Sequence, residues 1–294
     1  MAIRRKSSPR RSTVSPLLLK GRTVGVIGLG QVGGSIVQSL GRYRPTLTVY
    51  GYDVNSVLAR RARTHCRWAQ SIRDIVGASD LLILAAPVPA ILRLLPIVAA
   101  EARGHRAGKR LTVLDTGTVK AAPMRVAARY KGLFDFVGLH PLAGNERRGW
   151  DAATPDLFLD RRIVYCTTAP RSRCVAHARE LITLLGGTAI KMDAQEHDRF
   201  AALAIGLPHV LAFAADGLAN APKRGNPLRG GSWESLTRVA ASEPTMVAGF
   251  LSANVREQTR ILRRFGRRLD GLIRALENQS AAELTKTLEH LARR

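Results

Sequence analysis

Short apolar runs alternate with longer stretches of helical periodicity from Gly21 to about Asp193. Several of the runs are continuously apolar, which is typical of parallel strands that helices cover on both faces. Helical segments such as Ser35–Leu40 and Ser172–Leu185 separate the runs, so the pattern predicts an α/β domain with a doubly wound parallel sheet. The predicted strands are Thr23–Ile27, Leu47–Tyr52, Leu81–Ala85, Thr112–Asp115, Phe136–Leu139, Arg162–Cys166 and Ala189–Met192.

The strand pattern stops after Asp193. Glu196–Leu218 has the length and the apolar content of one long helix, interrupted only at Gly206-Leu207-Pro208. A loop rich in glycine and proline follows from Asn220 to Ser232. The change of pattern predicts a second domain that is built from helices alone.

The last part of the chain is also predicted to be helical. Apolar residues recur at steps of three and four between Val247 and Leu276, as on a helix that packs one face against its neighbours. Ser280 and Glu283 have the spacing of a capping box, which predicts the start of a final helix. The predicted division is a basic disordered tail at residues 1–20, the sheet domain at residues 21–193 and the smaller helical domain at residues 194–294.

The chain carries a large positive charge. Its 46 lysines and arginines against 22 acidic residues give a formal net charge of +24 over 294 residues. Such an excess is typical of proteins that bind nucleic acid, anionic membranes or acidic ligands. Arginine supplies 38 of the 46 basic residues, which indicates biased coding more than a binding surface. A basic nucleic-acid-associated protein is therefore kept only as an alternative class, and steeply salt-dependent DNA binding would favour it.

The sequence predicts neither a membrane span nor a metal site. The longest apolar stretch, Leu81 to Ala100, contains three prolines and one arginine, which predicts a buried strand followed by a loop and a helix. The three cysteines, Cys66, Cys166 and Cys174, are scattered and have no CxxC spacing. That arrangement argues against a disulfide framework and a zinc site, and it suits a cytoplasmic protein.

A glycine-rich turn follows the first predicted strand directly, because Thr23–Ile27 leads into Gly28-Leu-Gly30-Gln-Val-Gly33. Gly28 permits the tight turn, Gly30 lets the backbone approach a pyrophosphate, and Gly33 lets helix and strand pack closely. Asp53 ends the next strand, 20 residues beyond Gly33, where its carboxylate would hold a ribose diol and repel a 2′-phosphate. This fingerprint predicts a Rossmann-type domain that binds NAD rather than NADP. A glycine-rich turn that binds no nucleotide is the alternative.

Three further blocks follow the carboxyl ends of predicted strands, where an open α/β sheet places its crevice loops. They are AAPV at residues 85–88, DTGTVK at residues 115–120 and HPLAGNE at residues 140–146. Together with GVIGLGQVGGS, GYDVN, EHDRFAALAIGLPH and TRVAASEP, they resemble the prephenate and arogenate dehydrogenases, the TyrA family of tyrosine biosynthesis. The resemblance runs from about Val24 to Asn254, and Pro87 in the first block is assigned to the cofactor site.

The resemblance implies an NAD-dependent oxidative decarboxylation, of prephenate to 4-hydroxyphenylpyruvate or of arogenate to tyrosine. His140 matches the catalytic histidine of the family's HPxAG motif. A neutral imidazole there would accept the proton of the ring hydroxyl. Thr118 stands where the family usually has a serine that bonds this histidine or the substrate hydroxyl. No metal is implied.

Three residues are assigned to substrate binding through the same resemblance. Arg238 matches an arginine that holds a substrate carboxylate, a task that suits its planar fork. Glu146 matches a polar residue at the rim of the site, and His209 matches the last histidine of the family's SHxPH block. His197-Asp198 is interpreted only as a cap of the first helix of the second domain. Without the motifs, a structural histidine and a solvated arginine would be the simpler interpretations.

The sequence also departs from the family pattern. Ile205-Gly206 replaces a Ser-His pair, Ser235 stands where an aspartate is common, and Val247 replaces a tryptophan. These changes bear on the identity of the substrate more than on the type of reaction. The alternatives are a relative with an altered pocket that acts on another cyclohexadienyl acid, and a relative that binds NAD without catalysis.

A β-hydroxyacid dehydrogenase is the rival enzyme class, because its domains have a similar order. It needs a catalytic lysine on the first helices of the second domain, and Glu196–Leu218 contains none. In the TyrA family the helical domain pairs two subunits, so the resemblance implies a homodimer. The apolar stripe from Val247 to Leu276 fits that use, and coaxial core packing within one chain is the alternative. The expected substrate is a dianion, which positive charge around Arg238 would steer inward together with NAD.

Overall fold

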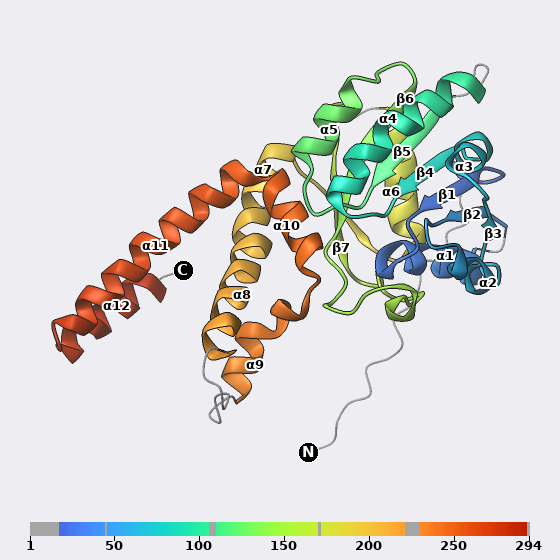
Figure 1. Cartoon of the computed structure of the whole chain (residues 1–294). Helices are drawn as coiled ribbons and strands as arrows, with labels where there is room; N and C mark the ends of the chain where they lie inside the picture. The colour runs from blue at the N-terminus through green and yellow to red at the C-terminus, as the bar shows by residue number, and fades with distance from the viewer. Residues whose placement is uncertain (1–17, 45, 106–109, 170–171, 221–229, 293–294) are drawn as a thin grey trace.

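The chain folds into a sheet domain and a helical domain that follow one another in sequence (Figure 1). The computed structural model describes residues 18–44, 46–105, 110–169, 172–220 and 230–292. Most of the predicted tail and of the predicted glycine- and proline-rich loop lies outside the described residues, so both stay predictions. In the described chain every strand precedes Met192 and only helices follow, which confirms the predicted fold class.

Eight strands form one sheet in the order β3-β2-β1-β4-β5-β6-β7-β8. They are β1 (Thr23–Ile27), β2 (Thr48–Tyr52), β3 (Arg67–Trp68), β4 (Leu81–Leu84), β5 (Leu111–Asp115), β6 (Phe134–Pro141), β7 (Arg162–Cys166) and β8 (Thr188–Lys191). The order runs outward from β1 in both directions, which is the doubly wound arrangement. The sequence prediction missed only the two-residue edge strand β3.

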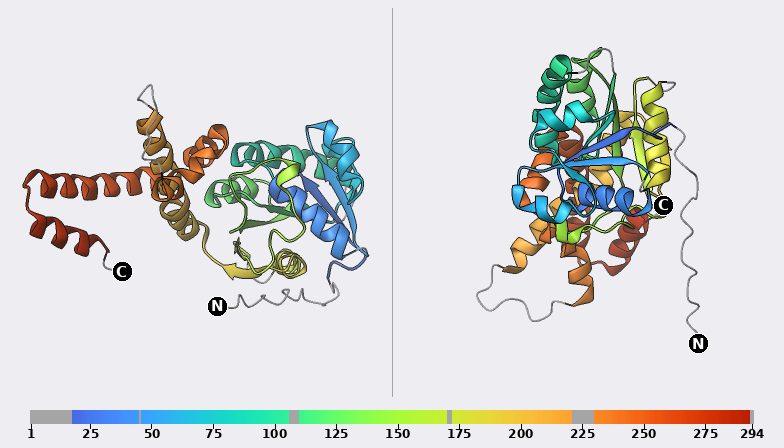
Figure 2. Two further views of the ribbon diagram at one scale, coloured as in Figure 1. Left: turned by 90° about the horizontal axis from the view of Figure 1, so that it is seen from below. Right: turned by 90° about the vertical axis from the view of Figure 1, so that its right-hand side faces the viewer.

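Helices cover both faces of this sheet, as Figure 2 shows in two further views. The helices and 3-10 turns are α1 (Gln31–Tyr43), η1 (Ser56–Leu58), α2 (Ala59–Ala62), α3 (Ile72–Ala78), α4 (Val88–His105), α5 (Ala121–Ala128), η2 (Trp150–Ala152) and α6 (Arg173–Leu184). Strand β4 shows why its sequence is continuously apolar. Leu81 and Ile83 pack into a core with α1 and α6, while Leu82 and Leu84 pack into a core with α3 and α4. Successive side chains point to opposite faces, and both faces are buried.

The direction of β7 differs from the predicted parallel sheet, because β7 is antiparallel to β6. Residues 142–161 between these strands contain the 3-10 turn η2 but no helix that crosses a face of the sheet. Two neighbouring strands can be parallel only if such a crossover connects them. Without one, the chain turns back and β7 runs antiparallel to β6. Gly138 of β6 pairs with Asp115 on one side and with Cys166 on the other. The strand β7 therefore ends level with the carboxyl end of β5. Its neighbour β8 ends beside it, and the second domain begins directly after β8.

The helical domain consists of α7 (Ala194–Ala201), η3 (Ala202–Gly206), α8 (Leu207–Asn220), α9 (Gly231–Thr237), η4 (Arg238–Ala241), α10 (Pro244–Ala253), α11 (Val255–Glu277) and α12 (Ala281–Ala292). The segment η3 is one π-helical turn, so α7, η3 and α8 form a continuous rod where the sequence predicted an interruption. Pro208 has no N–H to donate, and the widened turn ends at Gly206, two residues before it. Such π turns occur frequently at functional sites.

The helix α11 extends away from the rest of the molecule, and α12 folds back along it (Figures 1 and 2). The main-chain N–H of Glu283 donates to Oγ of Ser280 at 3.2 Å, which is one half of the predicted capping box. By length and composition alone the rod Ala194–Leu218 is apolar enough to cross a membrane, and 22% of its most apolar window is buried. A core helix of a soluble protein passes the same test. Several large apolar side chains on the rod and on α11 are exposed: Phe200, Leu203, Leu218, Leu269, Ile273 and Leu276.

Candidate active site

The glycine-rich turn between β1 and α1 forms a cradle that excludes side chains. Gly28 has φ +91°, and a Cβ atom there would lie 2.5 Å from the carbonyl oxygen of Ala85. A Cβ atom on Gly33 would lie 1.8 Å from the carbonyl oxygen of Gly28, so helix and turn could not pack. Gly30 is the N-cap of α1, and a Cβ atom placed on it would have no neighbouring atom within 4 Å. The turn is closed where it packs on the sheet and open where a pyrophosphate would approach.

The same turn presents donors to an anion. The first turn of α1 contains no acidic residue, and among the residues that the structure describes no side chain caps its N–H groups. Asp53 at the end of β2 accepts the N–H of Leu29 at 2.6 Å through one oxygen and the N–H of Asn55 at 2.9 Å through the other. These bonds fix the carboxylate beside the turn at partial exposure. The residues present therefore fit a dinucleotide with its phosphates at the helix N-terminus and its ribose at the carboxylate.

A cavity of about 300 Å³ joins blocks that are far apart in the sequence. Gly30, Pro87, Thr118 and Glu146 all line it, together with Phe250 from the helical domain. Four of the predicted site residues thus share one cavity between the two domains. Because parallel strands end at one edge of the sheet, the loops after β1, β4 and β5 meet there.

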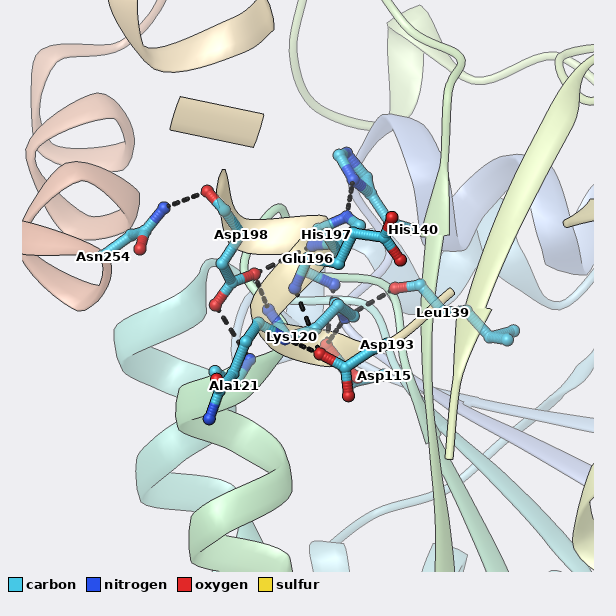
Figure 3. A network of polar contacts seen from close by, with 12 residues as sticks. Asp115, Lys120, Ala121, Leu139, His140, Asp193, Glu196, His197, Asp198 and Asn254 are labelled. Carbon is cyan, nitrogen blue, oxygen red and sulfur yellow. Dashed lines mark hydrogen bonds and ion pairs between the residues drawn. The ribbon is translucent and has the colours of Figure 1, made fainter. Parts of the chain in front are cut away.

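His140 lies near the end of β6 and is held by a buried histidine of the other domain (Figure 3). Its Nδ1 lies 2.8 Å from Nε2 of His197, and Nδ1 of His197 lies 2.8 Å from Oδ1 of Asp198. His140 is 7% exposed, His197 4% and Asp198 3%. Among the described residues, no hydrogen bond reaches the other ring nitrogen of His140, Nε2. Burial, with the nearby His197 and Lys120, holds the pKa of His140 well below its usual value.

Both the carboxylate and the main-chain carbonyl of Asp198 accept hydrogen bonds. Its carboxylate accepts the N–H of Lys120 at 2.7 Å and the N–H of Ala121 at 2.9 Å, the two groups that open helix α5. Nδ2 of Asn254 donates to its main-chain carbonyl at 2.7 Å. The cap of α7 is instead Asp193, so the interpretation of His197-Asp198 as a cap of that helix is wrong. Asp198 caps a helix of the sheet domain.

A buried ion pair lies beneath these histidines. Nζ of Lys120 donates to Oδ2 of Asp115 and, at 2.6 Å, to the carbonyl of Leu139, the residue before His140. Both side chains of the pair are fully buried. Burial raises the pKa of Asp115, and the ammonium of Lys120 opposes that shift. No role was predicted for Lys120 from the sequence, although a lysine directly after an apolar strand and a glycine turn is a signal of a buried charge.

Thr118 lines the cavity but does not hold His140. In the described chain no hydrogen bond joins Thr118 to His140, and Nδ1 of His140 is bonded to His197 instead. His197 of the helical domain therefore takes the first of the two roles predicted for residue 118, the bond to the histidine, and the bond to a substrate hydroxyl stays a prediction. Thr118 keeps a partly exposed position in the cavity, which leaves its hydroxyl to a ligand.

Arg238 and Glu146 meet at the rim. Nη1 of Arg238 donates to Oε2 of Glu146 at 2.7 Å, with the side chains 59% and 29% exposed. The hydrogen bond from its own main-chain N–H and the bond from Arg238 hold the pKa of Glu146 below its usual range. Glu146 lines both the first cavity and a neighbouring open one, of about 970 Å³, that contains Arg238 and Ser235.

His209 lies one layer behind the cavity. Its Nδ1 donates to the carbonyl of Ile205 at 2.8 Å, and its ring packs edge-on against Phe250 with the centroids 5.3 Å apart. Phe250 itself lines the cavity. The structure thus brings His209 against the wall of the site, in contact with a residue that a substrate would touch.

Neighbouring side chains pack at two of the positions where the sequence departs from the family pattern. A Cβ atom on Gly206 would lie 1.9 Å from Oε1 of Gln258, whose side chain occupies this space and is 5% exposed. Val247 is buried with Phe250 and the valines at 88 and 119. The missing imidazole at position 206 therefore leaves no void, because a buried amide from α11 takes its place.

Comparison with known proteins gives two consecutive matches. The model of the nucleotide-binding domain of prephenate dehydrogenase matches residues 36–191, and that of the prephenate dehydrogenase dimerization domain matches residues 193–290. Cyclohexadienyl dehydrogenase from Zymomonas mobilis is 32% identical over 276 residues, which cover 91% of this chain and 92% of that protein. Prephenate dehydrogenase from Bacillus subtilis is 27% identical over 276 residues, which cover 89% and 72% of the two chains.

Solved structures of the same fold have also been found. Prephenate dehydrogenase from Aquifex aeolicus, in complex with hydroxyphenyl propionate and NAD+, superimposes with a TM-score of 0.80 at 24% identity over 92% of this chain and 96% of that chain. Arogenate dehydrogenase from Synechocystis gives a TM-score of 0.72 at 23% identity over 91% and 96% of the chains.

Proposed function

The chain belongs to the prephenate dehydrogenase family, and we propose that it oxidises and decarboxylates a cyclohexadienyl acid, prephenate or arogenate, in tyrosine biosynthesis. The observation that carries the proposal is His140, a buried neutral imidazole whose Nε2 accepts no bond from the described protein. His140 itself lines neither cavity, but it stands near the end of β6, six residues before Glu146, which lines both of them.

NAD is the cofactor. Gly28, Gly30 and Gly33 would hold its pyrophosphate against the N-terminus of α1, and Asp53 would bind the ribose of the adenosine half. The negative charge of Asp53 also disfavours the 2′-phosphate of NADP. Pro87 lines the cavity beside the cradle and would face the cofactor. When bound, NAD accepts a hydride from the carbon that bears the substrate hydroxyl.

His140 would act as the general base on that hydroxyl. Its low pKa keeps the ring neutral at physiological pH, so Nε2 can take the hydroxyl proton. Loss of the ring carboxylate as carbon dioxide then yields an aromatic ring, which makes the reaction effectively irreversible. Thr118 would bond the same hydroxyl from the wall of the cavity.

Arg238 would bind a carboxylate of the substrate. One of its five N–H donors is bonded to Glu146, and its exposed guanidinium has others in the same plane for a bidentate contact. Glu146 then sets the orientation of the arginine at the rim. His209 would support the wall formed by Phe250.

A second copy of the chain is the expected protein partner. The matching family model names the helical part a dimerization domain. The exposed apolar side chains on the rod and on α11 are the kind of surface that a homodimer covers. The three cysteines are free thiols, in keeping with our placement of the protein in the cytoplasm.

Purified protein with NAD and either prephenate or arogenate tests the proposal. We expect reduced-nicotinamide absorbance to grow with at least one substrate, and the two values of kcat/KM identify the preferred one. Binding of NAD without turnover of either substrate would overturn the proposal in favour of an altered pocket or a non-catalytic relative. Titration of NAD by calorimetry in the same buffer separates that outcome from a misfolded preparation.

A further inference from the structure

The proposed function uses His140 alone, yet the structure joins it to two more buried groups. His140, His197 and Asp198 form an unbroken chain with two links of 2.8 Å, drawn as dashed lines in Figure 3. Two buried imidazoles bonded to one another, one of them also bonded to a carboxylate, are costly unless each proton has a defined place. The positions of these protons follow from the order of the groups.

The carboxylate of Asp198 determines which ring nitrogen carries the proton in His197 and in His140. Asp198 already accepts two main-chain N–H groups, so as a carboxylate it can only accept from His197. Nδ1 of His197 must then carry a proton, and neutral His197 accepts at Nε2. Nδ1 of His140 is therefore the donor of the 2.8 Å bond between the rings. The lone pair of His140 is left at Nε2, the nitrogen that the general base requires.

We propose that His197 and Asp198 act through His140 as positioning residues, and that His197 also receives a proton from His140 during turnover. The inference rests on the proposed function. The O–H bond of the substrate breaks, its proton bonds to Nε2 of His140, and its electron pair stays with the oxygen. The N–H bond at Nδ1 of His140 breaks in the same step, and that proton bonds to Nε2 of His197. His197 ends as an imidazolium that donates to Asp198.

The surroundings favour the charge on His197 over His140. Among the described residues, the charged groups that interact with the pair are Asp115 at the end of β5, Lys120 from the turn after it, and Asp198 from α7. The thiol of Cys166 on β7 stays protonated, since burial raises its pKa to about 12. Asp115 is already paired with Lys120, whereas Asp198 lies 2.8 Å from His197. A proton on His197 therefore forms a buried ion pair, and a proton left on His140 does not.

His197→Gln separates the two roles. The glutamine carbonyl can accept from Nδ1 of His140 and keep its tautomer, but it cannot take up a proton. We expect kcat to fall about 10²-fold, the low end of the range for general acid–base catalysis. The acidic limb of log kcat/KM should also move to lower pH, because the proton must then remain on His140. His197→Phe removes the acceptor as well, so we expect a larger loss and a mixture of tautomers.

His177→Gln is the matched control. His177 is also a buried histidine, bonded to Oγ1 of Thr112 at 3.1 Å on the α6 face, outside this chain of groups. We expect the kcat and the pH profile of the His177→Gln variant to match those of the unchanged protein. If His197→Gln behaves as His177→Gln does, with the same kcat and the same acidic limb, the transfer of a proton to His197 is overturned.

Imidazole ¹⁵N signals of the labelled protein, without substrate or cofactor, test the tautomer independently of turnover. We expect the signals of His140 to show a proton on Nδ1 and none on Nε2, in both the unchanged protein and His197→Gln. A proton on Nε2 of His140 in the unchanged protein would overturn the positioning role. Absence of turnover with both substrates would instead count against the proposed function, and the spectrum would still decide the tautomer.

Discussion

The two ends of the proposed site are built in opposite ways. At the buried end, Lys120 is fully buried and Asp198 is 3% exposed, and each makes several bonds to neighbouring groups. At the rim, Arg238 and Glu146 share one bond at 59% and 29% exposure. Buried charges are stable only with their partners in place, whereas an exposed pair can exchange a partner for water or a ligand. The proposed base is therefore held in a fixed geometry, and the arginine proposed to bind the substrate is free to adapt to it.

Removal of the base should have the largest effect. We expect His140→Asn to lower kcat roughly 10³- to 10⁴-fold, the upper part of the range for general acid–base catalysis. The dissociation constant of NAD should stay unchanged, because the glycine cradle lies on other loops. Steady-state kinetics and calorimetry on one preparation measure both quantities. Turnover close to that of the unchanged protein would remove His140 from the mechanism.

The next largest effect should come from the buried ion pair. Lys120→Met leaves Asp115 buried without its partner, and we expect a loss of about 3–5 kcal/mol in the free energy of unfolding. Burial then raises the pKa of Asp115 further, so the loss should shrink as pH falls and the carboxyl takes up a proton. Urea titrations across a range of pH measure this.

Two variants sharpen the result for the ion pair. The double variant Asp115→Asn with Lys120→Met should recover part of the lost stability, because no buried charge remains. Arg61→Gln breaks the exposed pair of Arg61 with Asp151, whose side chains are 50% and 76% exposed. This control should change the unfolding midpoint very little. Equal losses in the buried and exposed variants would contradict the contrast between the two ends.

At the rim the expected change is in binding. Arg238→Gln should lower kcat/KM roughly 10- to 100-fold, the value of a hydrogen bond to a charged group, with most of the change in KM. Arg238→Lys keeps the charge but loses the planar fork, so we expect an intermediate KM. A loss confined to kcat would show that Arg238 acts on the chemical step and not on binding.

The smallest effect should follow Glu146→Gln. Its carboxylate is held ionised by its low pKa, and it orients Arg238 through one exposed bond. We expect KM to change by no more than a few-fold and thermal stability to stay the same, because the pair is exposed. Measurement of KM at low and high salt checks the electrostatic origin of any change. A loss comparable to that of Arg238→Gln would mean that Glu146 itself contacts the substrate.

Local chemistry explains what the sequence predicted well. The glycines at 28, 30 and 33 and the carboxylate at 53 lie in one strand–turn–helix–strand unit, from β1 to the residue after β2, so their spacing alone predicted a cofactor site. The continuous apolar strands predicted a sheet covered on both faces for the same reason. Both features are visible as a local spacing or a local pattern in the sequence.

Contacts between distant residues explain what the sequence did not predict. His140 and His197 are 57 positions apart, and nothing local to either one indicates the other. The direction of β7 depends on the absence of a crossover helix in residues 142–161, a signal that apolar periodicity does not carry. Gln258 fills the space at Gly206 from another helix, so the sequence change there overstated the loss of volume.

The cap that Asp198 places on α5 also has a consequence for folding. The N–H groups that open this helix in the sheet domain are satisfied by a residue 78 positions later in the chain. A nascent chain that has completed β8 therefore possesses its whole sheet but neither the cap of α5 nor the partner of His140. We expect the two domains to unfold in a single cooperative transition, with hydrogen exchange at the start of α5 as slow as in the helices that follow Asp193.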